Sequence, residues 1–131
     1  MKKSSIKVTH IKPKYKDERG YISKIIDQEE FNIKSVLYIF RKKGSIGANH
    51  YHKKDAHFIY VLSGKIRYYE RDLEEKSKVE SVVLKPGDLV LSRPMKAHAT
   101  EILEEGVHLA FTTEKRNQKN YEEDTTRIKL I

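Results

Sequence analysis

The sequence predicts an all-β fold in which short strands follow one another closely and no long helix intervenes. β-branched and aromatic residues come in short blocks, as in the run from Ser35 to Arg41. Turn residues such as Gly64 and Gly87 separate these blocks at close spacing. This pattern is typical of an antiparallel sandwich or barrel, and periodicity alone does not choose among the folds of that class.

The expected strands cover most of the chain. In order, they span residues 6–11, 21–26, 35–41, 57–62, 66–71, 78–84, 89–91, 97–103 and 107–113, and a short segment before residue 57 carries His50 and His52. The polar tail, 114–131, is expected to be loose or partly helical and to end in a short closing strand at 128–131. We therefore expect one domain over residues 1–131, with a barrel core at about 35–113.

Composition restricts the chemistry and the partners. The chain has no cysteine, which excludes disulfides, thiolate metal sites and cysteine nucleophiles. No apolar run approaches the length of a membrane helix, and the basic N-terminus lacks a following apolar signal region, so we expect a cytoplasmic protein without a membrane partner. The net charge of +8 suits an anionic substrate, although basic and acidic residues are interleaved as on a solvated surface. No pattern specific to nucleic-acid binding is present.

Histidines gather in one stretch of the chain. His50 and His52 are two residues apart, so in a strand they project from the same face, about 7 Å apart. His57 and His98 each begin a neighbouring expected strand. Because neutral imidazole is a good ligand for transition metals, we expect these four side chains to hold one divalent ion, either Zn, Fe, Mn, Ni or Cu. Metal affinity should then fall as the pH drops through about 6.5, the pKa of an unperturbed histidine.

Two other readings of the histidines stay open at this point. The same four side chains would also suit a metal-free barrel in which they act as acid and base, or have no chemical role. His108 is expected outside the metal shell because it is opposite in parity to its apolar neighbours, and His10 is expected at the surface.

Polar side chains on the strands around the histidines are candidates for substrate binding and proton transfer. Tyrosine can donate or accept a proton, arginine can bind a phosphate or carboxylate through two hydrogen bonds, and asparagine can orient a ligand. The catalytic candidates are His50, His52, Tyr38 and Tyr60. The substrate-binding candidates are Arg93, Arg41, Asn49 and Tyr68.

The spacing of these residues resembles the cupin superfamily. Gly44, five residues, His50, one residue, His52, four residues, His57, six residues and Gly64 match the first cupin motif, except that His57 stands where that motif has glutamate. The stretch from Gly87 to His98 resembles the second motif. The resemblance implies a single-domain jelly-roll barrel that binds a metal through His50, His52, His57 and His98. Four neutral ligands would leave the full charge of a divalent ion uncompensated.

Three further stretches of sequence resemble one subgroup of cupins. They are Asp17-x-Arg19-Gly20, the run 33–40 and the run 49–54. They look like the sugar-nucleotide ketoisomerases and epimerase-related cupins of polysaccharide pathways. The resemblance implies a thymidine diphosphate sugar as substrate, His50 and His52 as an acid–base pair that commonly works without metal, and Tyr38 as a helper. It also implies a homodimer, which would cover exposed strand edges.

Three functions remain open from the sequence. The first is an isomerase or epimerase of keto sugars or nucleotide sugars. The second is a metal-dependent dioxygenase or related oxidoreductase. The third is a non-catalytic sugar-binding or regulatory barrel. The identity of the metal separates the second function from the other two, and turnover separates the first from the third.

Overall fold

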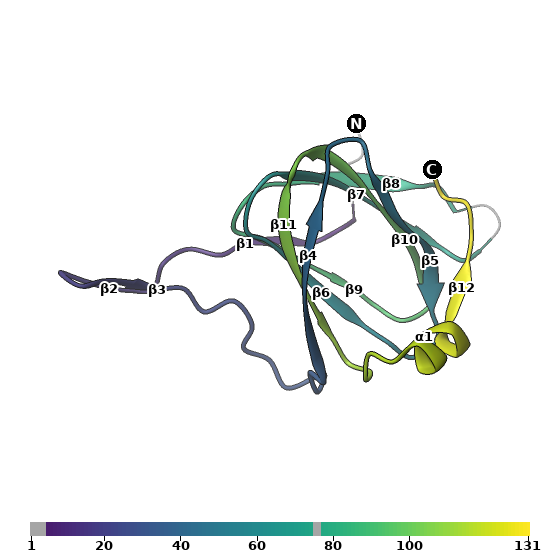
Figure 1. Cartoon of the computed structure of the whole chain (residues 1–131), viewed down its shortest axis with the longest axis horizontal. Helices are drawn as coiled ribbons and strands as arrows, with labels where there is room; N and C mark the ends of the chain where they lie inside the picture. The colour runs from purple at the N-terminus through teal and green to yellow at the C-terminus, as the bar shows by residue number, and fades with distance from the viewer. Residues whose placement is uncertain (1–4, 75–76) are drawn as a thin grey trace.

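Two antiparallel sheets face each other and enclose the interior of the protein. The computed structural model describes residues 5–74 and 77–131 (Figure 1). One sheet has the order β1-β9-β6-β11-β4 and the other has the order β12-β5-β10-β7-β8. The first sheet consists of β1 (Val8–His10), β9 (Asp88–Ser92), β6 (His57–Val61), β11 (Gly106–Thr112) and β4 (Ser35–Arg41). The second consists of β12 (Thr125–Arg127), β5 (Ile46–His52), β10 (Lys96–Glu104), β7 (Lys65–Asp72) and β8 (Glu80–Leu84).

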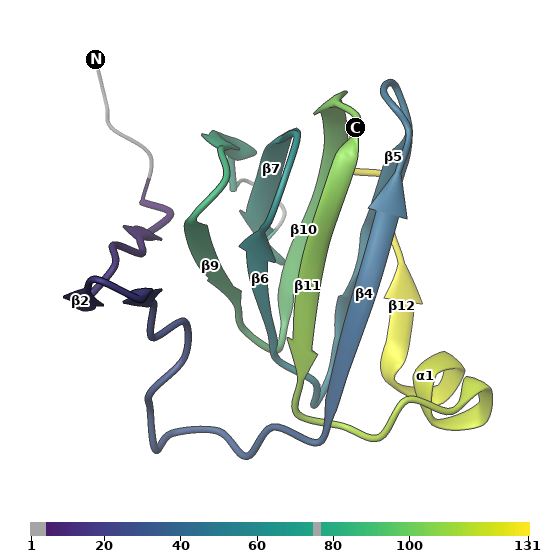
Figure 2. The same ribbon diagram turned by 60° about the vertical axis from the view of Figure 1, so that its left-hand side comes forward.

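A small hairpin and a short helix lie outside the two facing sheets. A hairpin of β2 (Tyr15–Asp17) and β3 (Gly20–Ile22) projects away from the body of the protein (Figure 1). A short helix, α1 (Gln118–Asp124), precedes β12 beside the edge of β5 (Figure 2). The predicted all-β jelly-roll class is therefore confirmed. In the described part of the chain, no helix is long and apolar enough to cross a membrane.

Most expected strands are present, and the ends of the chain differ most from expectation. The run 35–41 forms β4 with the expected bounds, whereas the strand expected at 21–26 is only the short β3. The closing strand lies at Thr125–Arg127 rather than at 128–131. The last residues are held differently, because the Asn49 side-chain oxygen accepts hydrogen bonds from the backbone N–H groups of Leu130, at 3.0 Å, and Ile131, at 3.2 Å.

The apolar core fills only one side of the interior. It gathers around β6, β7, β8 and β9 and contains Ile6, Ile59, Val61, Ile66, Tyr68, Leu84, Val90 and Ile102. The other side, between β4 and β11 on one sheet and β5 and β10 on the other, holds a cavity instead. This uneven filling leaves room for a ligand while the packed side supports the strands around it.

A bulge in β5 turns the two motif histidines inward. Ala48 and Asn49 have positive φ angles of 61° and 55°, which non-glycine residues adopt rarely. The pairing with β10 shifts at this point, because His98 faces His50 while the next pair is Ala99 with Ala48. The extra residue resets the alternation of the strand, so that His50 and His52 are both buried. Such strained bulges are common beside functional sites.

Candidate metal and proton-transfer site

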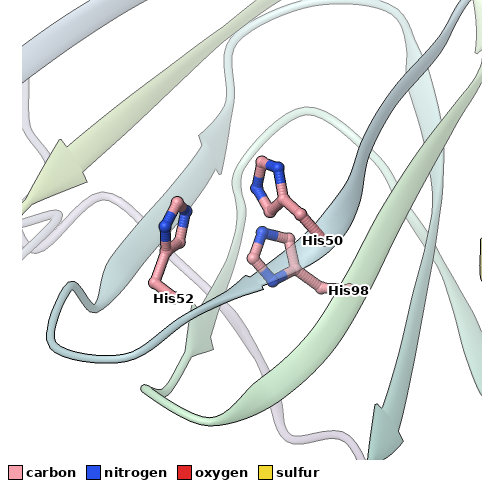
Figure 3. Close-up of side chains that lie close together, drawn as sticks. All are labelled: His50, His52 and His98. Atoms are coloured by element: carbon pink, nitrogen blue, oxygen red, sulfur yellow. The ribbon is translucent and has the colours of Figure 1, made fainter. Parts of the chain in front are cut away.

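Three of the four predicted metal ligands come together. One ring nitrogen from each of His50, His52 and His98 lies within 4.8 Å of the others, and all three side chains are buried. His50 and His52 come from β5 and His98 from β10, the neighbouring strand (Figure 3). Strand pairing therefore places the two histidine motifs of the sequence beside each other, as their spacing predicts.

Each of these rings is oriented through its Nδ1 atom. Nδ1 of His98 lies 3.0 Å from the Ser92 hydroxyl and 3.3 Å from the carbonyl oxygen of Lys96. Nδ1 of His52 lies 3.1 Å from the Thr125 hydroxyl. A longer contact of 3.5 Å joins Nδ1 of His50 to the Tyr121 hydroxyl. Oxygen partners on Nδ1 are how metal-binding histidines are usually held, with Nε2 left for the ion.

The Nε2 atom of His52 is the strongest sign that something binds here. It is buried and has no hydrogen-bond partner among the described residues. Leaving such an atom unsatisfied costs about 1–3 kcal/mol, so buried polar atoms without partners call for an explanation. A divalent ion held by the three imidazoles would supply the missing partner, and its ligand set fits Zn, Fe, Ni or Cu.

Burial keeps the three rings neutral, which metal binding requires. Burial lowers the pKa of His50 to about 2, that of His52 to about 4 and that of His98 to about 3. The neighbouring imidazoles add to each shift, because a second positive charge in this cluster is unfavourable. The rings can therefore offer lone pairs over a wide pH range.

His57, the fourth predicted ligand, is engaged elsewhere. Its Nε2 lies 2.7 Å from a carboxylate oxygen of Asp55. The other Asp55 oxygen accepts hydrogen bonds from the backbone N–H and the hydroxyl of Thr113, at 2.9 and 3.1 Å. His57 thus belongs to a second group of ligand atoms, formed by His52, Asp55 and His57, which shares only His52 with the first.

The Asp55 carboxylate fixes the orientation of His57. Burial alone would raise the pKa of Asp55, but the hydrogen bond from His57 and the backbone of Thr113 outweigh it, and the net shift is downward. An ionised carboxylate only accepts, so Nε2 of His57 carries a hydrogen and Nδ1 is left to exchange a proton. His57 also lines the cavity, where a bound molecule would meet it.

The other predicted site residues are dispersed. Tyr38 is 71% exposed on the outer face of β4, since Leu37 and Ile39 are the residues of that strand that line the cavity. Tyr60 lies on the outer face of β6, because its neighbour Ile59 points into the cavity. Neither tyrosine lines the cavity.

Most of the candidates for substrate binding also lie away from the cavity. Tyr68 is fully buried in the core and donates a hydrogen bond to Glu70 at 3.0 Å. Arg93 forms an ion pair of 2.8 Å with Glu30 away from the cavity, and Asn49 anchors the C-terminal residues. Of these four candidates, only Arg41 lines the cavity.

Sequence reasoning missed several residues that the fold brings to the site. Asp55 carried a local signal, since it lies only two residues before His57. The others are Arg116, Tyr121, Asp124 and Thr125, from the tail expected to be loose or partly helical. No local pattern links them to histidines about 70 positions earlier, and only the pairing of β12 with β5 does so.

The facing sheets and the buried histidine cluster define a cupin. A cupin domain model matches residues 36–112, which is more than half of the chain. The protein therefore belongs to the cupin family. No curated protein sequence matches the chain.

Solved structures agree on this fold. A 3,4-ketoisomerase from Helicobacter canadensis has 19% identity and a TM-score of 0.74, with 94% of this chain and 90% of that chain covered. A sugar 3,4-ketoisomerase from Thermoanaerobacterium thermosaccharolyticum in complex with TDP has 22% identity and a TM-score of 0.74, covering 93% and 87%. A dTDP-4-dehydrorhamnose 3,5-epimerase from Elizabethkingia anophelis has 19% identity and a TM-score of 0.77, covering 98% and 79%.

Proposed function

We propose that this cupin is an isomerase or epimerase of a keto sugar carried on a nucleotide, with a divalent ion bound by His50, His52 and His98. The observation that carries the proposal is that the unpartnered Nε2 atom of His52 lies in the same histidine cluster as the oriented Asp55–His57 couple, beside a cavity that His50, His57 and His98 line. The similarity in fold to sugar ketoisomerases and epimerases supports the same reaction class. A net charge of +8 suits a diphosphate substrate.

The reaction needs a group that takes up and returns a proton. Isomerisation or epimerisation moves a proton at a carbon next to a carbonyl group. His57 can accept that proton at Nδ1 while the Asp55 carboxylate stabilises the resulting imidazolium. A bound divalent ion would act as a Lewis acid that polarises the carbonyl oxygen. This assignment gives His57, rather than the outward-facing Tyr38 or Tyr60, the proton-transfer role.

Solvent exchange tests the reaction directly. The purified protein is incubated in D₂O with TDP-4-keto-6-deoxyglucose, and NMR follows the hydrogens next to the keto group. We expect deuterium to enter at such a position, whether or not a stable product accumulates. If the protein binds this sugar nucleotide but exchanges no hydrogen, the non-catalytic alternative gains and the isomerase proposal fails.

Asp55→Asn should slow the exchange by about tenfold to a hundredfold, within the range that general base catalysis contributes. The two Thr113 donors hold the oxygen of the new amide, so its NH₂ group faces His57. Nε2 must then accept, and the hydrogen moves to Nδ1, which can no longer take a proton. The measurement is the initial rate of deuterium uptake, and Glu70→Gln, which changes a carboxylate outside the cavity, is the matched control. Equal rates for Asp55→Asn and the parent would refute the role of His57.

A metal-dependent dioxygenase is the second candidate, because His52, Asp55 and His57 form a two-histidine, one-carboxylate group. Such groups hold iron in many oxygenases. In this structure, however, the hydrogen bond of 2.7 Å between Asp55 and His57 occupies two of the three ligands. Tightly bound iron together with substrate-dependent oxygen consumption would favour this second function.

A homodimer is part of the proposal, with the outer face of β4 as its contact. β4 is an edge strand, and its outward residues Val36, Tyr38 and Phe40 are 57, 71 and 47% exposed. Exposed apolar edge strands usually pair with a partner. The projecting hairpin adds Tyr15 and Tyr21, which are also exposed.

Tyr38→Asp should weaken the dimer by about thirtyfold or more, the effect of losing an interface residue worth about 2 kcal/mol. Light scattering after size-exclusion chromatography, over a series of protein concentrations, measures the change. Ile46→Asp is the matched control, because Ile46 is an exposed apolar residue, 55% accessible, on the other sheet. A parent protein that stays monomeric at every concentration would contradict the dimer.

A further inference from the structure

The cavity has a second polar end that the proposed chemistry does not use. His108 lies on β11 opposite Val61, while Thr112 on the same strand lies opposite His57. Four residues of strand separate the two levels, or about 13 Å. Arg41 and His108 both line the cavity at this end, away from the site of proton transfer.

His108 is buried, yet its ring has no hydrogen-bond partner in the described part of the chain. The residue is only 7% exposed, and none of the described residues forms a hydrogen bond with its ring. Its surroundings in the cavity are apolar or small, including Leu37, Ile39 and Ala110. A buried imidazole of this kind gains a hydrogen bond only from a molecule that enters the cavity.

Charge indicates what that molecule carries. Arg41 forms no ion pair among residues 5–74 and 77–131, and its one recorded side-chain hydrogen bond, to the Phe40 carbonyl, is long at 3.4 Å. Arg116 also lines the cavity, whereas none of the described lining residues is acidic. Burial and then the charge of Arg41 lower the pKa of His108 to about 4, so the ring is neutral at physiological pH and can donate one hydrogen bond.

We propose that Arg41 and His108 form a subsite for an oxyanion, a phosphate or carboxylate group carried by the substrate. The guanidinium group binds two oxygens of such a group, and the imidazole donates a third hydrogen bond. The substrate then lies along the cavity, with its anionic group at Arg41 and its reacting carbons at His57. The link to the reaction rests on the proposed function, whereas binding of the oxyanion does not.

Binding of simple ions tests the subsite in the full-length protein. Inorganic phosphate, acetate and TDP are titrated separately, and the ring nitrogens of ¹⁵N-labelled histidines are followed by NMR. We expect the His108 signals to move with phosphate, acetate or both, and a response to only one ion identifies the group that the subsite takes. His108 signals that move with none of the three would overturn the proposal.

Two variants and one control complete the test. Arg41→Gln and His108→Phe, in which a ring of similar size replaces the imidazole, should each raise the Kd of the responding ion about tenfold or more, the effect expected for a charge-assisted hydrogen bond. Arg67→Gln, an arginine outside the cavity that lies 3.9 Å from Glu101, should leave the Kd unchanged. Parent-like binding by both cavity variants would overturn the subsite.

The outcome is separable from that of the proposed function. Metal content and solvent exchange are measured on the same samples. Oxyanion binding that depends on Arg41 and His108 in a protein without metal or exchange would support the subsite and refute only the proposed reaction. Metal binding and exchange without any oxyanion response would refute only the subsite.

Discussion

His52→Ala should purify with little or no divalent ion, because it removes the proposed ligand whose Nε2 atom has no hydrogen-bond partner among the described residues. Replacing a residue that merely orients a ligand usually weakens metal binding by 10- to 100-fold, so loss of the ligand itself should weaken it by about 100-fold or more. Elemental analysis after dialysis against a weak chelator measures the loss. His52 also belongs to both groups of ligand atoms, so its removal affects either arrangement of the metal.

His57→Gln is the informative comparison, since the glutamine amide can still donate a hydrogen bond to Asp55. We expect this variant to keep its metal while it loses solvent exchange. That combination would separate the metal ligands from the proton-transfer couple. Equal metal loss in His52→Ala and His57→Gln would instead support the four-histidine metal shell that the sequence predicts. Retention of metal in both variants would refute the proposed metal site.

The spacing of the histidines contains enough information to predict the centre of this site. A strand alternates its side chains, which places His50 and His52 on one face, and the second motif brings His98 alongside them. The bulge at Ala48 and Asn49 determines which face points inward, and neither residue is the glycine that would mark a positive φ angle in the sequence.

The direction of His57 could not be predicted from motif spacing. Spacing places this residue near the other histidines, and its ring does lie 4.7 Å from that of His52. The hydrogen bond to Asp55 nevertheless draws Nε2 to a carboxylate, and Thr113, more than 50 residues later, holds that carboxylate in place. Contacts of this kind depend on strand pairing across the whole chain, which a local pattern does not encode.

The contacts of the C-terminal tail, residues 114–131, also could not be predicted from a local pattern. Its polar composition predicts a loose or partly helical segment, and α1 confirms the helical part. The composition does not predict that Asp124 accepts hydrogen bonds from the backbone N–H groups of Lys54 and Asp55, at 2.8 and 3.0 Å. These hydrogen bonds, together with the contact between Thr125 and His52, hold the tail against the histidine site. A polar segment can be ordered in this way when it supplies hydrogen-bond partners to backbone groups beside a sheet edge.

Four of the buried histidines have lowered pKa values and should make the metal-free protein sensitive to mild acid. In the unfolded chain each histidine takes up a proton near pH 6.5. In the folded chain the pKa is about 2 for His50, about 3 for His98, and about 4 for His52 and His108. Folded pKa values below the unfolded value mean that stability is complete above pH 6.5 and is lost as the pH falls toward the folded values.

The expected loss is large compared with the stability of a small domain. Each of the four histidines should lower the free energy of unfolding by about 2 kcal/mol between pH 7 and pH 5, giving a total of several kcal/mol against a usual stability of about 5–15 kcal/mol. Urea unfolding of chelator-treated protein at pH 8, 7, 6 and 5 measures this dependence. His108→Phe should show a shallower slope, by about one proton, because it removes one of the titrating groups without changing the proposed metal ligands. A free energy of unfolding that stays constant between pH 7 and pH 5 would mean that water reaches these rings in the folded protein, and the closed, neutral histidine cluster would have to be abandoned.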